Sequence, residues 1–348
     1  MVTENRTITL NGHRLPLKHF SEPAFKKLFP DTDFFSDIGA FLAQWANPSE
    51  YLELKTSGST GIPKTITAPK KLLEFSAVQT CTFFGLNASH TALLCLPVTY
   101  IAGKMMLIRA IVSGMNVICI PPQGHIAEQI NQTIHFAAMV PVQVQKAVSH
   151  PNFAFIKNLI IGGGRVPEPL IEMLKNTLVH GFETFGMTET FSHIALKQLT
   201  PVTHNRFTVF NGVQITVNSA NQLIISCDGL HIKNLLTNDI VELHSPTQFR
   251  WIGRTDFVIN AGGIKISPEQ IEQQLTPHIP HPFYITGQPD ALLGEIPVLL
   301  IEANPFNTTE LVNFMRSVLP AYHIPKQIYF LPLFTRTQSG KIIRTKMK

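Results

Sequence analysis

The segment from Thr56 to Lys64, TSGSTGIPK, joins hydroxyl side chains, glycines and a lysine directly after a stretch that reads as a strand. Gly58 and Gly61 let the backbone turn and leave its amides exposed. The hydroxyls that can surround phosphate oxygens with these amides belong to Thr56, Ser57, Ser59 and Thr60. With Lys64 as the countercharge, the pattern predicts a phosphate-binding loop, and the alternative is a serine- and glycine-rich surface turn.

A Walker A loop is the obvious competing interpretation, because it also ends in a lysine that reaches phosphate. In that loop the lysine directly follows a glycine, whereas here Pro63 precedes Lys64. A proline has no amide to donate and fixes φ, so this loop cannot close in the Walker manner.

Three further segments carry residues suited to a nucleotide site. They are FGMTET at Phe185–Thr190, the stretch from Asp239 in LLTNDIVEL through GRTDFVINAGGIKISPEQIE to Glu272, and QSGKIIR at Gln338–Arg344. In this order and spread, the four segments resemble the adenylate-forming (AMP-binding) superfamily of acyl-CoA synthetases, luciferases and peptide-synthetase adenylation domains. The resemblance covers Leu54 to Lys348.

The resemblance implies roles in nucleotide binding. Phe185, followed by Gly186, would stack on adenine in place of the family's usual tyrosine, while Thr188 would touch the α-phosphate. Glu189 and Thr60 would hold magnesium, although an isolated acid such as Glu189 also reads as a solvated loop carboxylate. Glycines of the IGGGR segment, Gly163 and Gly164, would form the adenine floor or simply a tight turn.

The resemblance also implies roles for the C-terminal half. Asp239 would bind both ribose hydroxyls beside Arg254, and Asn238 stands where the family has a glycine, a replacement that asparagine's tolerance of left-handed backbone would accommodate. Asp256 falls at the family's domain hinge. Gly262 and Gly263 would leave room for the pantetheine arm of coenzyme A, and Lys341 would bridge carboxylate and α-phosphate, unless the final basic residues are only a cationic tail.

The implied activity is that of an acid-thiol ligase, which makes an acyl-adenylate from ATP with magnesium and then a thioester with coenzyme A. Segments 96–110 and 185–197 look most like 2-succinylbenzoate-CoA ligases of menaquinone biosynthesis. The alternatives are an acyl- or aryl-CoA synthetase for another carboxylic acid, an adenylation enzyme that loads a carrier protein, and a nucleotide-binding protein without turnover.

Candidates for the substrate pocket surround these segments. A second carboxylate on the substrate needs a cation, which Lys104 or Arg109 could provide, unless both reach solvent along their flexible stems. Tyr100 replaces the histidine of many relatives. The further pocket candidates are Thr190, Ser192 and His193, of which the histidine could equally be a hydrogen-bonded packing residue.

Composition fits a cytoplasmic enzyme. The 348 residues are 15% charged and 44% hydrophobic, with a net charge of +5 that suits ATP, coenzyme A and a small carboxylic acid; nucleic acid would suit it too, but no matching module is visible. No secretory signal, uninterrupted membrane span or metal-binding cysteine spacing is apparent, and the four cysteines read as reduced core residues. A homodimer stays open.

Hydrophobic periodicity predicts an α/β protein. Strands are expected at 51–55, 65–67, 92–96, 116–120, 136–140, 158–161 and 179–184, with helices between most of them. Short alternating strands between 206 and 251 predict an antiparallel β subdomain, and helices are expected near 268–275 and 308–319. The chain thus reads as an AMP-binding N-terminal domain, 1–255, shortened at its start, and a small mobile α+β C-terminal lid domain, 256–348.

Overall fold

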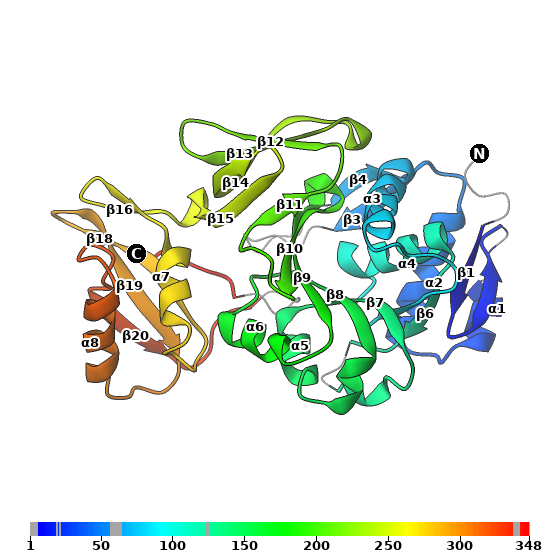
Figure 1. The fold of residues 1–348 in the computed structure, drawn as a ribbon, viewed down its shortest axis with the longest axis horizontal. Coiled ribbons are helices and arrows are strands. Elements are labelled where there is room, and N and C mark those ends of the chain that lie inside the picture. Colours follow the sequence, from blue (N-terminus) through cyan, green and yellow to red (C-terminus); the bar gives the residue numbers. More distant parts are fainter. Residues whose placement is uncertain are drawn as a thin grey trace.

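The computed structural model describes residues 6–18, 20, 22–55, 65–122, 125–336 and 342–347. Within these ranges the chain forms a large sheet, a smaller sheet and a two-stranded ribbon, with helices packed against them (Figure 1). This is the α/β architecture that the periodicity predicts.

The large sheet runs through most of the chain. Among the described residues it has 13 strands in the order β12-β13-β14-β15-β11-β10-β9-β8-β7-β5-β6-β1-β2. Neighbours from β9 to β1 in this order are parallel, and the remaining neighbours are antiparallel. The strands are β1 Thr7–Leu10, β2 His13–Pro16, β5 Thr91–Leu94, β6 Asn116–Cys119, β7 Ile134–Met139, β8 Ile156–Ile161, β9 His180–Met187, β10 Ser192–Thr200, β11 Phe207–Val209, β12 Val213–Val217, β13 Gln222–Cys227, β14 Ile232–Ser245 and β15 Gln248–Arg254.

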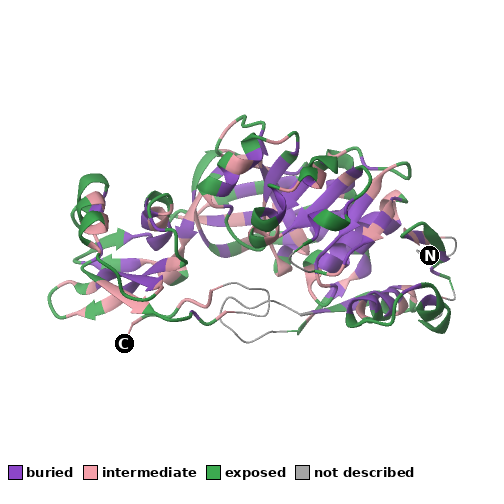
Figure 2. Cartoon of the chain, turned by 90° about the horizontal axis from the view of Figure 1, so that it is seen from below, coloured by how far each residue is buried: buried purple, intermediate pink, exposed green. Residues whose placement is uncertain are grey.

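The parallel strands are covered by helices on both faces. Successive residues such as Leu93 and Leu94, or Leu159 and Ile160, belong to different hydrophobic clusters, because side chains of a strand alternate between the faces. Helices α3 (Lys70–Phe83) and α4 (Ile101–Ser113) contribute to one cluster. Helices α5 (Pro141–Ala147) and α6 (Glu168–Lys175) contribute to the other. Figure 2 shows the resulting concentration of buried residues along the strands of the large sheet.

The N-terminal residues extend this sheet. Strand β1 pairs in parallel with β6, and β2 closes a hairpin on β1. Two helices follow, α1 (Glu22–Leu28) and α2 (Asp33–Ala46), before the ribbon of β3 (Tyr51–Lys55) and β4 (Thr65–Pro69). The Thr32 hydroxyl oxygen accepts a hydrogen bond from the Phe35 amide at 3.5 Å and so caps α2.

The second sheet follows the last strand of the large one. It contains β16 (Ile259–Ala261), β17 (Ile264–Ile266), β18 (Phe283–Asp290), β19 (Gly294–Glu302) and β20 (Gln327–Leu331). Helices α7 (Pro268–Leu275) and α8 (Thr309–Val318) pack on it around a core of its own that includes Ile259, Ile271 and Leu299. In Figure 1 this part lies at the left, beyond β15.

Short 3-10 turns connect several of these elements, at Ala127–Gln129, Pro151–Phe155, Thr188–Thr190, Asp228–Leu230 and Thr255–Phe257. The cysteines Cys81, Cys95, Cys119 and Cys227 are free thiols and buried, as expected of core residues. Within the described ranges, no helix has the length and apolar character needed to cross a membrane.

Candidate functional site

The predicted site residues of the N-terminal half gather where parallel strands end. Tyr100 is the N-cap of α4 after β5, Gly162–Arg165 follow β8, and Thr188–Thr190 follow β9. The Gly162 amide donates to the Met139 carbonyl at 3.1 Å, which ties the end of β8 to the end of β7. Open α/β sheets bind ligands outside the carboxyl ends of their strands, so this edge is the candidate active site.

The phosphate loop lies outside the described residues, and so does the C-terminal lysine. This concerns Thr56, Ser57, Gly58, Ser59, Thr60, Gly61, Lys64 and Lys341. The two strands that flank the loop are described, and Lys55 pairs directly with Thr65. The loop therefore begins and ends on neighbouring antiparallel strands.

The glycine segment after β8 needs its glycines for two physical reasons. Gly163 has φ of +82°, a conformation that residues with a side chain rarely adopt. A Cβ at Gly162 would lie 2.6 Å from the Thr184 hydroxyl, whereas a Cβ at Gly164 would meet nothing within 4 Å. The segment is thus a tight turn that also presents bare, exposed backbone at the strand edge.

Phe185, Thr188 and Glu189 lie at the end of β9 and on the 3-10 turn that follows. Phe185 is half-buried and meets the Phe249 ring edge to face, with centroids 5.0 Å apart at 77°. Gly186 pairs with His193 on β10, and a side chain at this glycine would collide with that strand. Glu189 is exposed, which is compatible with a magnesium ligand and with a solvated loop carboxylate alike.

Arg109 carries a deeply buried charge in this region. Its side chain is 2% exposed, and its guanidinium donates through Nη2 to the Ser192 hydroxyl at 3.1 Å, while the same nitrogen lies 3.4 Å from His193 Nδ1. Within the described part of the chain, its Nε is buried without a hydrogen-bond partner and no carboxylate forms an ion pair with it. Burial lowers the pKa of Arg109 to about 10, so the group stays charged at neutral pH.

His193 connects Arg109 to helix α3. Its Nε2 lies 3.3 Å from the Thr80 hydroxyl, which in turn donates to the Ser76 carbonyl. Because Arg109 can only donate, Nδ1 of His193 accepts and Nε2 carries the proton that points to Thr80. Desolvation, helped by the charge of Arg109, holds the pKa of His193 well below its usual value. The imidazole is therefore neutral and orients the guanidinium.

Two other pocket candidates face elsewhere. Lys104, on another side of α4, donates to the Glu53 carbonyl at 3.2 Å and thus contacts strand β3. The Thr190 hydroxyl accepts from the Met187 amide at 3.0 Å and contacts the Ser192 carbonyl at 2.7 Å, so it serves the turn after β9. Among the described residues, side-chain contacts join Arg109, Ser192 and His193, while Thr190 contacts the Ser192 carbonyl and Lys104 contacts Glu53.

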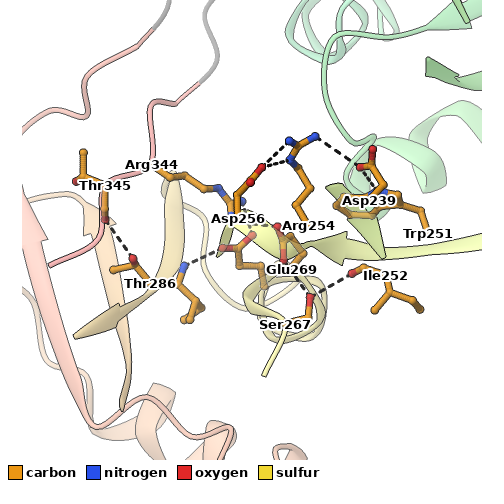
Figure 3. Close-up of polar contacts among 12 residues, drawn as sticks. Asp239, Trp251, Ile252, Arg254, Asp256, Ser267, Glu269, Thr286, Arg344 and Thr345 are labelled. Atoms are coloured by element: carbon orange, nitrogen blue, oxygen red, sulfur yellow. Dashed lines mark hydrogen bonds and ion pairs between the residues drawn. The ribbon is translucent and has the colours of Figure 1, made fainter. Parts of the chain in front are cut away.

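Asp239 and Arg254 lie on neighbouring strands near the start of the second sheet (Figure 3). Asp239 is 6% exposed, accepts a hydrogen bond from Trp251 Nε1 at 2.9 Å and lies 3.8 Å from Arg254 Nη1. Burial raises the pKa of Asp239, against the opposing effects of Trp251 and Arg254. The Arg254 guanidinium also binds Asp256, with Nε 3.1 Å from Oδ2. One arginine thus links the predicted ribose carboxylate to the predicted hinge residue.

The backbone of Asn238 does not have the left-handed conformation that the sequence suggested. Its backbone lies in strand β14 and is not among the left-handed residues, so the conformational tolerance of asparagine is not needed here. Instead its side-chain amide donates to Asp256 Oδ1 at 2.9 Å. Replacement of glycine by asparagine therefore adds a contact to the predicted hinge.

Gly262 and Gly263 form the exposed turn between β16 and β17, with φ of +61° and +85°. The Gly262 amide donates to the Leu293 carbonyl at 2.7 Å, and the Asn260 amide donates to Glu295 at 2.9 Å. The turn is thereby fixed to the second sheet.

The sequence did not indicate two groups of ion pairs, one of them buried. Glu183 on β9 forms an ion pair with Lys197 on β10. Arg344 binds Glu272 at 2.6 Å and lies 3.9 Å from Glu269, and both acids are on α7 (Figure 3). A charge at an inward position of an apolar strand was the available signal for Glu183 and Lys197, but their pairing depends on strand register.

Comparison with known proteins agrees with this geometry. Residues 54–222 match the family described as AMP-binding enzyme, and residues 283–341 match the AMP-binding enzyme C-terminal domain. A solved structure from Dyadobacter fermentans, described as an acyl-CoA synthetase (AMP-forming)/AMP-acid ligase II-like protein, is 34% identical with a TM-score of 0.61, and the match covers 90% of this chain and 93% of that one. The chain belongs to the AMP-binding enzyme family.

Two relatives carry more specific names. The 2-succinylbenzoate–CoA ligase of Bacillus cytotoxicus is 25% identical, over 84% of this chain and 68% of that protein. The O-succinylbenzoate coenzyme A synthetase of Bacillus subtilis, solved in complex with ATP and magnesium ion, has a TM-score of 0.74 at 22% identity, over 84% of this chain and 68% of that one. The similarity to the Bacillus subtilis structure, at 22% identity, supports the fold alone.

Proposed function

We propose that the protein is an ATP-dependent, AMP-forming acid-thiol ligase that converts 2-succinylbenzoate to its coenzyme A thioester, a step of menaquinone biosynthesis. The observation that carries the substrate is the buried Arg109, which has no acidic partner among the described residues and donates to Ser192. A buried cation without a counterion is costly unless a ligand supplies the anion. The ring carboxylate of 2-succinylbenzoate is such an anion, and the other carboxylate remains for activation.

The residues divide the work of adenylation. Phe185 and the glycine segment 162–165 hold the base, and Asp239 accepts hydrogen bonds from the ribose hydroxyls. Thr188 and the loop 56–64, with Lys64, position the phosphates, and Lys341 neutralises charge as the carboxylate attacks the α-phosphate and pyrophosphate leaves. Exposed Glu189, with Thr60, fits a magnesium ion on the triphosphate, which would supply further charge neutralisation.

The second half-reaction uses the C-terminal domain. We place the domain boundary at 255/256 and the hinge at Asp256, because the large sheet ends at Arg254 and the next strand already belongs to a separate core. Rotation about the hinge would bring the turn at Gly262 and Gly263 to the acyl-adenylate, where the coenzyme A thiolate attacks the acyl carbon and AMP leaves. ATP and coenzyme A as substrates favour a cytoplasmic location; a homodimer is not part of the proposal.

A matched pair of substrates tests the assignment of Arg109. 2-Succinylbenzoate and 4-oxo-4-phenylbutanoate share the succinyl carboxylate, but only the first has the ring carboxylate. We expect pyrophosphate release and thioester formation with the first, and Arg109→Met should lower its kcat/KM about a hundredfold because a charged hydrogen bond is lost. The second substrate should react poorly with both proteins and to a similar extent.

Lys104→Met is the control, because Lys104 lies on the same helix but contacts Glu53. An equal loss with both substrates in Arg109→Met would contradict the assignment and give Arg109 a structural role. Turnover by the unmodified protein only with other carboxylic acids would keep the ligase chemistry and refute the substrate. Thioester formation on a carrier protein instead of coenzyme A would favour the adenylation-module alternative.

A further inference from the structure

Strands β9 and β10 hold a buried ion pair next to the predicted nucleotide site. Glu183 and Lys197 are direct partners in the register of these strands, and Lys197 Nζ forms an ion pair with Glu183 Oε2. The two side chains are 6% and 11% exposed. Neither residue has a role in the proposed reaction, although Lys197 is the last residue of the segment 185–197.

The carboxylate of Glu183 also fixes the glycine segment. Its Oε1 accepts a hydrogen bond from the Val166 amide at 3.1 Å, and Val166 directly follows Gly162–Arg165. The other end of the segment is fixed by the bond from the Gly162 amide to Met139. The exposed glycine backbone is thus held at both ends, and at one of them by a buried side chain.

The ammonium of Lys197 contacts the aromatic cluster of Phe185, Phe207 and Phe249, which is the second wall of the proposed base site. Its Nζ lies 5.3 Å from the centroid of the Phe207 ring, a cation–π contact. Phe207 stacks on Phe249 at 5.3 Å and 19°, and Phe249 meets the edge of Phe185. One ion pair therefore contacts both the residue that follows the glycine segment and the aromatic cluster that includes Phe185. The three strands β9, β10 and β11 lie next to one another in Figure 1.

Stability alone does not explain the pair. Removing two charges from water costs about as much as their attraction returns, and well-packed apolar residues in place of a buried pair are often as stabilising or more so. A buried pair that also anchors a loop and an aromatic wall can instead fix the distance between them.

We propose that Glu183 and Lys197 are a positioning pair for the nucleotide, which sets the spacing between the glycine segment and Phe185 so that a planar adenine fits between them. The inference rests on the proposed function for the assignment of these two walls to the base. The pair acts through Val166 and Phe207 and does not itself touch the nucleotide.

The test measures AMP affinity and thermal stability separately, by titration calorimetry and melting. The double variant Glu183→Leu/Lys197→Met removes both charges and the acceptor for the Val166 amide while it keeps apolar volume. We expect its Tm to fall modestly, because the buried Val166 amide loses its acceptor, and its Kd for AMP to rise about tenfold, because a displaced glycine segment weakens positioning. Glu183→Gln, which keeps an oxygen for Val166, should weaken AMP binding less.

Glu74→Gln is the matched control, since it breaks the ion pair between Arg6 and Glu74 on α3 and should leave the Kd for AMP unchanged. A folded double variant that binds AMP with unchanged affinity overturns the proposal. If the double variant does not fold, the test is hydrogen exchange at the Val166 amide. AMP must slow this exchange in the unmodified protein, and the slowing must be smaller in Glu183→Gln. Absence of an AMP effect in the unmodified protein overturns the proposal.

These measurements need no turnover, so they separate the two proposals. AMP binding with the expected variant effects, but no reaction of 2-succinylbenzoate, refutes the proposed function and keeps the positioning pair. Normal turnover of 2-succinylbenzoate by both the unmodified protein and the double variant keeps the proposed function and refutes the positioning pair.

Discussion

Arg109 and Asp239 are both buried charges, but their surroundings differ. Arg109 has polar neighbours that cannot neutralise it, and it retains its proton because its pKa of about 10 remains far above neutrality. Asp239 has a donor in Trp251 and a cation in Arg254, yet burial still raises its pKa. In both residues, burial disfavours the charged form more than the neighbouring groups stabilise it. Such shifted pKa values are common where a ligand completes the contacts.

Asp239→Asn should separate binding from stability. The folded pKa of Asp239 is raised above its ordinary value of 3.8. Between these two values the folded protein holds a proton that the unfolded chain releases, so the contribution of Asp239 to stability falls as the pH rises through this window. At pH 7 the neutral amide should therefore not destabilise the protein, whereas ATP affinity should fall about tenfold because charge-assisted bonds to ribose are lost.

Melting curves and ATP titrations at pH 7 check this, with Asp256→Asn as the control because Asp256 shares Arg254 but is exposed. In the unmodified protein, ATP binding should also weaken as acidification protonates Asp239. A variant that melts earlier and binds ATP normally would make Asp239 a structural residue.

At the scale of elements, helix α4 determines where Arg109 lies. Its residues are buried on most sides, as expected of a helix enclosed by the fold. Tyr100 is its N-cap, after the loop that follows β5. At its other end Gly114, which has φ of +80°, closes the helix with a bond from its amide to the Ala110 carbonyl. Gly103 allows its first turn to approach the preceding loop, because a Cβ there would lie 2.7 Å from the Pro97 carbonyl carbon.

Gly103→Ala should therefore displace α4. The Pro97 contact is with backbone, which cannot move aside as a flexible side chain could, so we expect a loss of about 2 kcal/mol in the free energy of unfolding. Activity with 2-succinylbenzoate should fall as well, because Arg109 moves with the helix. Denaturant unfolding and turnover measure the two effects.

Gly39→Ala, in helix α2, is the control, since its Cβ would meet only the Phe25 ring at 3.2 Å. It should change stability much less and leave turnover intact. A Gly103→Ala protein with normal stability would mean that α4 tolerates a shift.

The sequence predicted those elements whose signals are local. The strand at 51–55 and the helix at 268–275 have the expected bounds, because periodicity and Pro268 mark them. Motifs named the residues that the structure places at the carboxyl edge of the parallel strands, and their roles stay predictions. Contacts that depend on register or on a helix face were not predictable: which of Lys104 and Arg109 turns toward Ser192, the pairing of Glu183 with Lys197, and the bond from Asn238 to Asp256. Strand β1, far from its partner β6 in sequence, was missed for the same reason.

At the scale of the whole molecule, the two sheets meet through a small set of polar contacts. Ser267, at the start of α7, donates to the Ile252 carbonyl on β15 at 3.3 Å and lies 3.0 Å from Glu269 (Figure 3). Gly253 leaves room for this approach, since a Cβ there would lie 2.6 Å from Glu269 Oε2. Polar contacts of this kind are compatible with the proposed rotation of the C-terminal domain, during which they would break and re-form.

Asn238→Gly restores the residue typical of the family and should loosen the hinge. The variant loses the bond from the Asn238 amide to Asp256, and one such bond contributes about 1 kcal/mol, or roughly a fivefold change in the population of an opened hinge. Trypsin cleaves after arginine, and Arg254 lies two residues before the proposed hinge residue Asp256. Trypsin cleavage after Arg254 should accelerate roughly fivefold when opening of the hinge is fast compared with cutting, because the cleavage rate then follows the open population.

Asn234→Gly is the control, because it makes the same substitution on the same strand. The Asn234 side chain bonds Ser226 and its φ is already +50°, so this variant should leave the cleavage unchanged. Equal cleavage rates in all three proteins would show that Asn238 does not restrain Asp256.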